Sequence, residues 1–135
     1  YLHRISRPLL DRIDLHVEAE PVKYEELTGE RKEETSEIIR ERVLLARQRQ
    51  EERYRGTELR FNRDLTPAHL EEYCSLGEGE ARLMAEIYRK KELTARAFHR
   101  LLKVSRTIAD LEGSREIESH HISEAVLYRP IRQLM

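Results

Sequence analysis

The chain has 135 residues, a length that fits one domain with a single modest core and not two domains. Hydrophobic residues make up 39% and charged residues 38%, with only 5 Gly and 4 Pro, so the composition favours helix, and the periodic spacing of the apolar residues argues against disorder. The 25 basic and 26 acidic side chains nearly cancel, which argues against a freestanding nucleic-acid-binding module but leaves a local basic face open.

The first 33 residues predict little regular structure. Residues 8–12 are typical of a single helical turn that Ser6 can cap. Residues 13–18 alternate apolar with polar, which predicts a short half-buried strand that Pro21 closes. The polar stretch 22–32 that follows is predicted to be a connector.

A series of helices is predicted from residue 34 onward. The first carries an apolar stripe, followed by a charged run, residues 47–55, that predicts a solvated helix end and is the most plausible nucleic-acid contact in the chain. Shorter helices are predicted over residues 66–73 and 80–91. The strongest pattern starts at Thr94 as N-cap and stops at Gly113, and a last helix covers residues 119–128. The stripe of the first helix comprises Ile38, Ile39, Val43, Leu45 and Ala46. The sequence thus predicts a mainly α chain with a bundle of about five helices.

Other features exclude several classes of site. The single Cys74 excludes an internal disulfide and a cysteine-based zinc site, and a lone free thiol fits a small core residue in a reducing cytoplasm. No apolar run approaches the length of a membrane span, and no signal peptide is visible. Because the first residue is Tyr1 and not Met, we expect the chain to begin inside a larger protein.

A complete nucleotide site is not encoded in this sequence. The five glycines never fall into the G-x-x-x-x-G-K-[ST] pattern of a phosphate-binding loop (Walker A). No apolar strand ends in paired acidic residues that could hold Mg²⁺ (Walker B). We therefore expect no ATP hydrolysis by the chain alone.

Three arginines are candidates for contact with an anion. Arg12 lies on a short turn just before the predicted strand, where a guanidinium can project rigidly towards phosphate oxygens, although a surface ion pair with Asp11 or Asp14 explains it as well. Arg96 lies two residues after Thr94, where a cation opposes the helix macrodipole unless an anion binds there, and a tolerated exposed arginine is the alternative. Arg106 is expected to pair with Asp110 at i+4 or to pack between helices.

The adjacent His120 and His121 are expected to be surface or capping residues. They lack the i, i+4 spacing of a helical metal site, and no carboxylate or thiol set accompanies them in the sequence pattern. No metal ligands are predicted.

Three segments resemble magnesium-chelatase-like AAA+ ATPases, including the ComM/YifB group. Residues 5–16 (ISRPLLDRIDLH) resemble the end of the AAA+ core in these proteins. Residues 93–113, with LTARA and then LKVSRTIADLEG, resemble the lid helix of that group, and residues 122–129 (ISEAVLYR) resemble its closing helix. The segments occur in the same order and spacing across most of the chain.

The resemblance implies roles for the arginines. Arg12 matches the arginine finger that completes the active site of the adjacent subunit in trans, and Arg96 matches the sensor-2 arginine, which contacts nucleotide bound to its own subunit. Arg7 departs from the ComM pattern, which has glycine before this proline, so Arg7 assists Arg12 or is surface variation. Arg7 and Arg106 are secondary candidates.

The resemblance also implies a fold and a parent protein. It predicts a helical-bundle AAA+ lid domain preceded by a short strand remnant of the AAA+ core, with residues 1–20 as the end of the core, 21–33 as a linker and 34–135 as the lid domain. The parent is expected to be a cytoplasmic ring, a hexamer, that uses ATP and Mg²⁺ to remodel DNA by branch migration in competence. The partners implied for this chain are the rest of its AAA+ core, the neighbouring subunits and DNA, with no membrane; no tightly bound cofactor is expected on the chain alone.

Two alternatives remain open from the sequence. One is the ATPase motor subunit of a true magnesium chelatase, which drives magnesium insertion into a porphyrin. The other is a helical module that binds DNA or a protein partner and has no nucleotide role.

Overall fold

The computed structural model describes residues 6, 9, 12–17, 19, 23–28 and 33–128. Five α-helices follow Thr35 in this described part: α3 (Ser36–Arg53), α4 (Leu70–Tyr73), α5 (Glu78–Lys90), α6 (Ala95–Glu112) and α7 (Ser119–Val126). Two short 3-10 turns, Asn62–Asp64 and Pro67–His69, join α3 to α4. The prediction of a mainly α chain with about five helices is confirmed.

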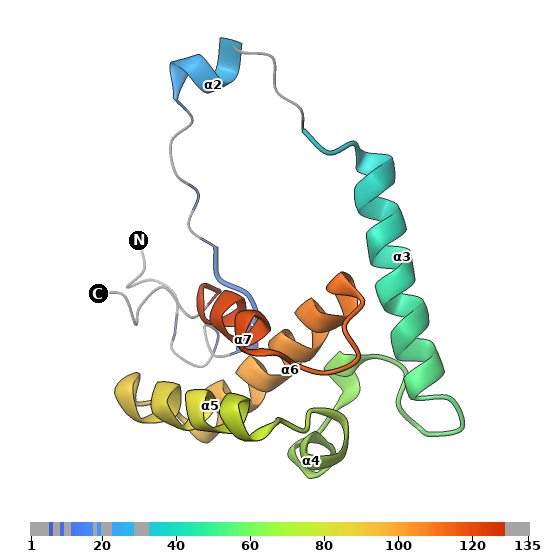
Figure 1. The fold of residues 1–135 in the computed structure, drawn as a ribbon, viewed down its shortest axis with the longest axis vertical. Helices are drawn as coiled ribbons and strands as arrows, with labels where there is room; N and C mark the ends of the chain where they lie inside the picture. Colours follow the sequence, from blue (N-terminus) through green and yellow to red (C-terminus); the bar gives the residue numbers. More distant parts are fainter. Residues whose placement is uncertain are drawn as a thin grey trace.

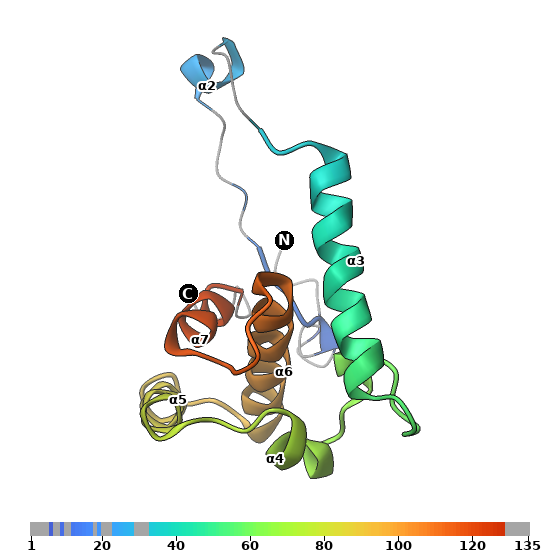
Figure 2. The same cartoon turned by 45° about the vertical axis from the view of Figure 1, so that its right-hand side comes forward.

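Helix α6 is the centre of the bundle. It packs against α7 on one side and against the end of α3 on another, while α5 lies against α7 and α4 lies across the base (Figures 1 and 2). The buried core gathers side chains from α4, α5, α6, α7 and the segments that connect the helices: Tyr54, Leu65, Leu70, Cys74, Met84, Leu102, Ile117 and Ile122. The prediction of Cys74 as a small core residue is confirmed, since it is only 3% exposed.

Local signals set both ends of α6. The Thr94 hydroxyl accepts a hydrogen bond from the backbone N–H of Ala97 at 3.1 Å, so it caps the first turn as predicted. At the other end Gly113 adopts φ +84°, a left-handed conformation that favours glycine, and the Ser114 N–H donates to the Ala109 carbonyl. The turn at Gly113 sends the chain back along α6 towards α7.

The apolar stripe predicted for the first helix is not buried. Ala46 is buried, but Ile38, Ile39, Val43 and Leu45 are 42–50% exposed. The reason is the length of α3, whose first half rises clear of α6 and α7 in both views (Figures 1 and 2). Among the described residues nothing covers these apolar side chains, so the predicted stripe lies on one helix but only its end at Ala46 is buried.

The predicted strand at residues 13–18 is not found in its described part, residues 13–17. A strand needs a neighbouring strand to pair its backbone groups. Here the backbone N–H of His16 instead donates to the carbonyl of Tyr128 at 3.0 Å, so the segment lies against the end of α7. The predicted connector is also partly helical, because α2 spans Tyr24–Thr28.

None of the helices in the described part of the chain is long and apolar enough to cross a membrane.

Candidate functional site

Arg12 and Arg96, the two arginines that the sequence analysis ranked first, line one cavity of about 460 Å³ at the start of α6. Both residues are exposed. Three further basic residues of α6 line the same cavity, and Asp14 is the one carboxylate among the described lining residues, which are Arg12, Asp14, Leu65, Pro67, Leu70, Arg96, His99, Arg100 and Lys103.

The helical period explains this concentration of basic side chains. Arg96, Arg100 and Lys103 are spaced by four and three residues, which places them on one face of α6. Arg96 is in the first turn of the helix, where the macrodipole is positive and the free N–H groups point outward. Cations there are unfavourable unless an anion is bound, so the cavity has the electrostatics of an anion site.

The cavity fits a phosphate group and does not fit a magnesium ion. Guanidinium and ammonium groups are hydrogen-bond donors that match phosphate oxygens. Mg²⁺ needs several oxygen ligands, whereas the lining residues that the structure describes offer one carboxylate, Asp14, whose Oδ1 is 3.9 Å from Nε of the buried Arg100. The described residues of this chain therefore supply only part of a nucleotide site.

Arg106 serves the fold of the bundle. It is 4% exposed, and its guanidinium forms an ion pair with the Asp110 carboxylate at 3.1 Å, so the predicted i, i+4 pairing is confirmed. It also donates to the backbone carbonyls of Ser114 and Arg115, at 2.8 and 3.0 Å, and so holds the turn that follows α6. Arg106 is thus buried among internal partners, away from the cavity that holds Arg96.

Asp110 is the hub of a buried polar network. Its carboxylate, which has no exposed surface, accepts hydrogen bonds from Arg53 and from the amide of Asn62 in addition to its pair with Arg106. Asn62 is held in turn by the Tyr54 hydroxyl, which donates to its side-chain oxygen. Buried polar groups of this kind must be satisfied, and their partners here come from α3, the 3-10 turn and α6.

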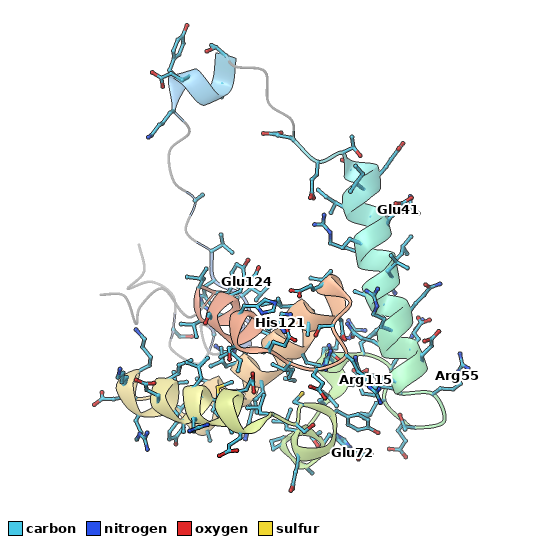
Figure 3. The ribbon with its side chains drawn as sticks, viewed as in Figure 1. Glu41, Arg55, Glu72, Arg115, His121 and Glu124 are labelled. Carbon is cyan, nitrogen blue, oxygen red and sulfur yellow. The ribbon has the colours of Figure 1, made fainter. Side chains whose placement is uncertain are left out.

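This network corrects the prediction for residues 47–55. The run was expected to be a solvated helix end, but Gln50 and Tyr54 are buried, and the Arg53 side chain is only 21% exposed. The ion pair between Arg53 and the Asp110 carboxylate directs one side of this run towards the interior of the bundle. The outer residues remain in solvent, as Arg55 does where it projects away from the bundle (Figure 3).

The two adjacent histidines have carboxylate neighbours that the sequence pattern did not indicate. Ligand atoms of Glu112, Glu118, His120 and His121 all lie within 4.8 Å of one another, because the turn at Gly113 brings the start of α7 back to the end of α6. The hydrogen bonds from His120 and His121 lower the pKa of the Glu112 carboxyl, with His120 the larger cause.

His121 is committed to the fold. Its Nδ1 accepts the backbone N–H of Glu118 at 2.8 Å, so the ring proton is on Nε2, 2.9 Å from the Glu112 carboxylate. Both nitrogens of His121 are therefore in use, and the predicted capping role is confirmed. The side chain lies inside the bundle in Figure 3 and is fully buried.

The structure thus brings Arg12 and Arg96 together and separates both from Arg106, while Arg7 lies outside the described residues. Sequence reasoning missed His99, Arg100 and Lys103 as lining residues of the cavity. Their i, i+3, i+4, i+7 spacing from Arg96 was the signal that could have found them.

Known proteins are similar to this sequence over nearly the whole chain. The family model described as magnesium chelatase, subunit ChlI C-terminal, matches residues 33–129. The competence protein ComM of Haemophilus influenzae is 41% identical over the full chain, and the protein YifB is 37% identical in Salmonella typhimurium and 36% in Escherichia coli. The chain spans only 26% of the length of each of these relatives.

Proposed function

Because this chain belongs to the magnesium chelatase subunit ChlI C-terminal family, we propose that it forms the C-terminal lid and part of the subunit interface of a AAA+ ATPase ring. The observation that carries the proposal is the cavity that Arg12 and Arg96 line at the start of α6. In the parent protein ATP and Mg²⁺ are the cofactors. The phosphate-binding loop and the magnesium ligands belong to the AAA+ core, so the chain by itself has no ATPase activity.

Arg96 is the sensor-2 arginine in this proposal. It stands in the first turn of α6, where a phosphate group of the nucleotide meets both its guanidinium and the positive end of the helix. Contact between the lid and the nucleotide of the same subunit then links lid position to the state of the nucleotide.

Arg12 is the arginine finger in this proposal. Transfer of the terminal phosphoryl group of ATP to water develops negative charge, and an arginine that reaches this charge is worth ~10³–10⁵ in rate. Arg12 is exposed, so it is accessible to a nucleotide held by the neighbouring subunit. A ring, which we propose is a hexamer, provides that neighbour.

The decisive experiment measures ATP turnover by the full-length parent carrying Arg12→Ala. We expect ATP binding to be retained and turnover to fall by at least a hundredfold. Arg82→Ala, which removes an exposed arginine of α5 whose side chain is 77% exposed, is the matched control and should leave turnover unchanged. Unchanged turnover in Arg12→Ala contradicts the assignment.

Mixed rings separate action in trans from action in cis. The Arg12→Ala parent is combined with a parent whose phosphate-binding lysine in the core is replaced, each inactive alone. If Arg12 serves the neighbouring subunit, some interfaces regain both an intact nucleotide site and an intact arginine, and turnover returns. If Arg12 serves the nucleotide of its own chain, as its position beside Arg96 also permits, no interface is complete and the mixture stays inactive.

Arg96 is tested by nucleotide affinity. Arg96→Ala in the parent should weaken ATP binding as well as turnover, because a direct phosphate contact is lost. Equal affinity in the variant and the wild type contradicts the sensor-2 role.

For the parent we propose a cytoplasmic motor that works on DNA. The support is the similarity to ComM, whose name associates that relative with competence. Branch migration of a DNA junction, driven by ATP and assayed on a synthetic four-way junction, tests the substrate class.

A second candidate function comes from the description of the matching family, which is a magnesium chelatase subunit. A chelatase motor predicts ATP turnover that rises when the porphyrin-binding partner is added and does not respond to DNA. The two candidates therefore give opposite results in the same pair of assays.

A further inference from the structure

Three exposed arginines surround one aromatic ring beside the end of α3. The guanidinium carbons of Arg47, Arg60 and Arg63 lie 5.1, 5.0 and 5.5 Å from the centre of the Phe61 ring. All three arginines are exposed, and Phe61 is half-buried. We refer to Arg47, Arg60 and Arg63 around Phe61 as the arginine cluster.

The positive charges of the arginine cluster are only weakly compensated. The three guanidinium groups surround the same ring, so the distances between them are about the Debye length at ~0.1 M salt or shorter. Their positive charges therefore repel one another. The carboxylates near them are distant: Glu51 is 3.8 Å from Arg60, and Asp64 is 3.9 Å from Arg63. Both pairs are exposed, and their distances are at the outer limit of an ion pair. The positive charge of the cluster is therefore incompletely neutralised and can attract a further anion.

The loop that carries the cluster is held rigidly in place. Asn62, between Phe61 and Arg63, is 3% exposed, and its amide donates to Asp110 and Thr107 at 2.9 and 3.0 Å. On the outer side, the Asp64 carboxylate accepts the backbone N–H groups of Phe61 and Arg60, which lower its pKa. The buried Asn62 thus anchors a loop that presents Arg60 and Arg63 to solvent, so little backbone ordering entropy is lost when a ligand binds.

The basic surface continues from the arginine cluster to α6. Arg63 and Lys103 line the same cavity of about 530 Å³, together with Arg42 and Arg100 and with the carboxylates of Asp14, Glu112 and Glu124. Lys103 and Arg100 also line the cavity that holds Arg96. Arg42 is paired with Glu34 and Arg100 is buried beside Asp14, so Lys103 is the cation of this cavity that continues the basic surface from Arg63 towards the start of α6.

We propose that the arginine cluster binds the phosphate backbone of a single strand of nucleic acid. Guanidinium forks match phosphate oxygens in two-point contacts, and their planes also stack on bases. A strand that carries one phosphate per nucleotide can place phosphates at several guanidinium groups of the arginine cluster and extend towards Lys103. The inference rests on the proposed function in one respect, that the parent works on DNA.

The test is binding of a fluorescent oligo-dT of about 20 nucleotides to this chain without ATP, followed by anisotropy from low to moderate salt. The triple variant R47Q/R60Q/R63Q should bind at least tenfold more weakly at low salt. The slope of log affinity against log salt should become shallower by about 2, since each phosphate contact on a single strand contributes roughly 0.7. The triple lysine variant R47K/R60K/R63K should keep the wild-type slope.

The matched control is R40Q/R82Q/R89Q, which removes the same charge from exposed arginines on α3 and α5 outside the cluster. It should bind within twofold of the wild type. Equal losses in both triple variants, or no binding by the wild type at low salt, overturn the proposal. Poly-glutamate and unlabelled oligo-dT are also compared as competitors at equal concentrations of negative charge. If poly-glutamate competes as well as oligo-dT, the proposal is overturned and the cluster is assigned to an acidic protein. Urea unfolding of each variant verifies that the fold is intact.

Failure of this inference and failure of the proposed function are distinguishable. If the ATPase role fails, Arg12→Ala in the parent turns over ATP normally while oligo-dT binding by this chain still depends on the arginine cluster. If only this inference fails, the Arg12 result stands, and the cluster variants bind oligo-dT like the wild type.

Discussion

The carboxylate of Asp110 accepts two hydrogen bonds from the guanidinium of Arg53, 57 residues earlier in the chain. This contact fastens the last turn of α3 to the last turns of α6, and Asn62 joins it from the intervening loop. The same anchor that stabilises the bundle therefore positions the arginine cluster. The RTIADLEG segment, one of the motifs that carry the resemblance, provides this anchor through Arg106 and Asp110.

Replacing Asp110 with Ala should lower the free energy of unfolding by about 3–5 kcal/mol. The reason is that Arg106, 4% exposed, loses its counter-charge while it remains buried. Urea unfolding measures the change. Glu71→Ala, at an exposed position of α4, is the control and should change stability by no more than ~0.5 kcal/mol. A comparable change in both variants contradicts the role of Asp110.

Two glycine substitutions should have opposite signs. Gly113→Ala should destabilise the fold by about 1–2 kcal/mol, because φ is +84° there and a Cβ would lie 3.0 Å from the Arg49 side chain. Gly79→Ala, in the first turn of α5 with nothing within 4 Å of the new Cβ, should stabilise it by up to about 1 kcal/mol. Thermal unfolding of the two variants provides the comparison, and a stabilised Gly113→Ala would refute the left-handed cap.

The same substitution at two isoleucines tests the exposed half of α3. Ile122 is fully buried, and Ile122→Ala should cost about 2–5 kcal/mol. Ile39 is 46% exposed, so Ile39→Ala in this chain should cost less than about 1 kcal/mol. Denaturant unfolding separates the two. Equal costs would mean that the first half of α3 is covered in solution.

Stability should fall at alkaline pH. Burial raises the pKa of Tyr54 from 10.0 to about 12 and that of the Cys74 thiol from 9.0 to about 11. Because both folded-state values are raised, the neutral forms favour folding: their contribution is complete below the unfolded pKa values and is lost as pH rises through about 9 to 12. Urea midpoints from pH 8 upward measure the loss.

Tyr54→Phe should remove part of this alkaline decline, and Tyr88→Phe, at an exposed tyrosine, should not. For the same reason Cys74 should resist alkylation in the native state at pH 8 and react once urea unfolds the chain. Rapid alkylation of the native protein would contradict the buried position of the thiol.

Local information in the sequence was enough for the helices of the bundle. Thr94 and Gly113 set the ends of α6 through short-range hydrogen bonds and backbone conformation, so their signals are readable from neighbouring residues. In α7 the buried Ile122 and Ala125 are three residues apart, as neighbours on one face of a helix are.

The sequence by itself therefore determined the fold class, the caps and the candidate arginines Arg12 and Arg96, since each depends on residues within a turn or two or on a motif of contiguous letters. Only the tertiary structure decided that Arg53 turns inward to Asp110, that Glu112 meets His120 and His121, and that Arg47 joins Arg60 and Arg63 at one ring. It also decided that the apolar stripe of α3 stays exposed. These outcomes depend on which helices meet, and contacts between residues far apart in the chain leave no periodic signal in the sequence.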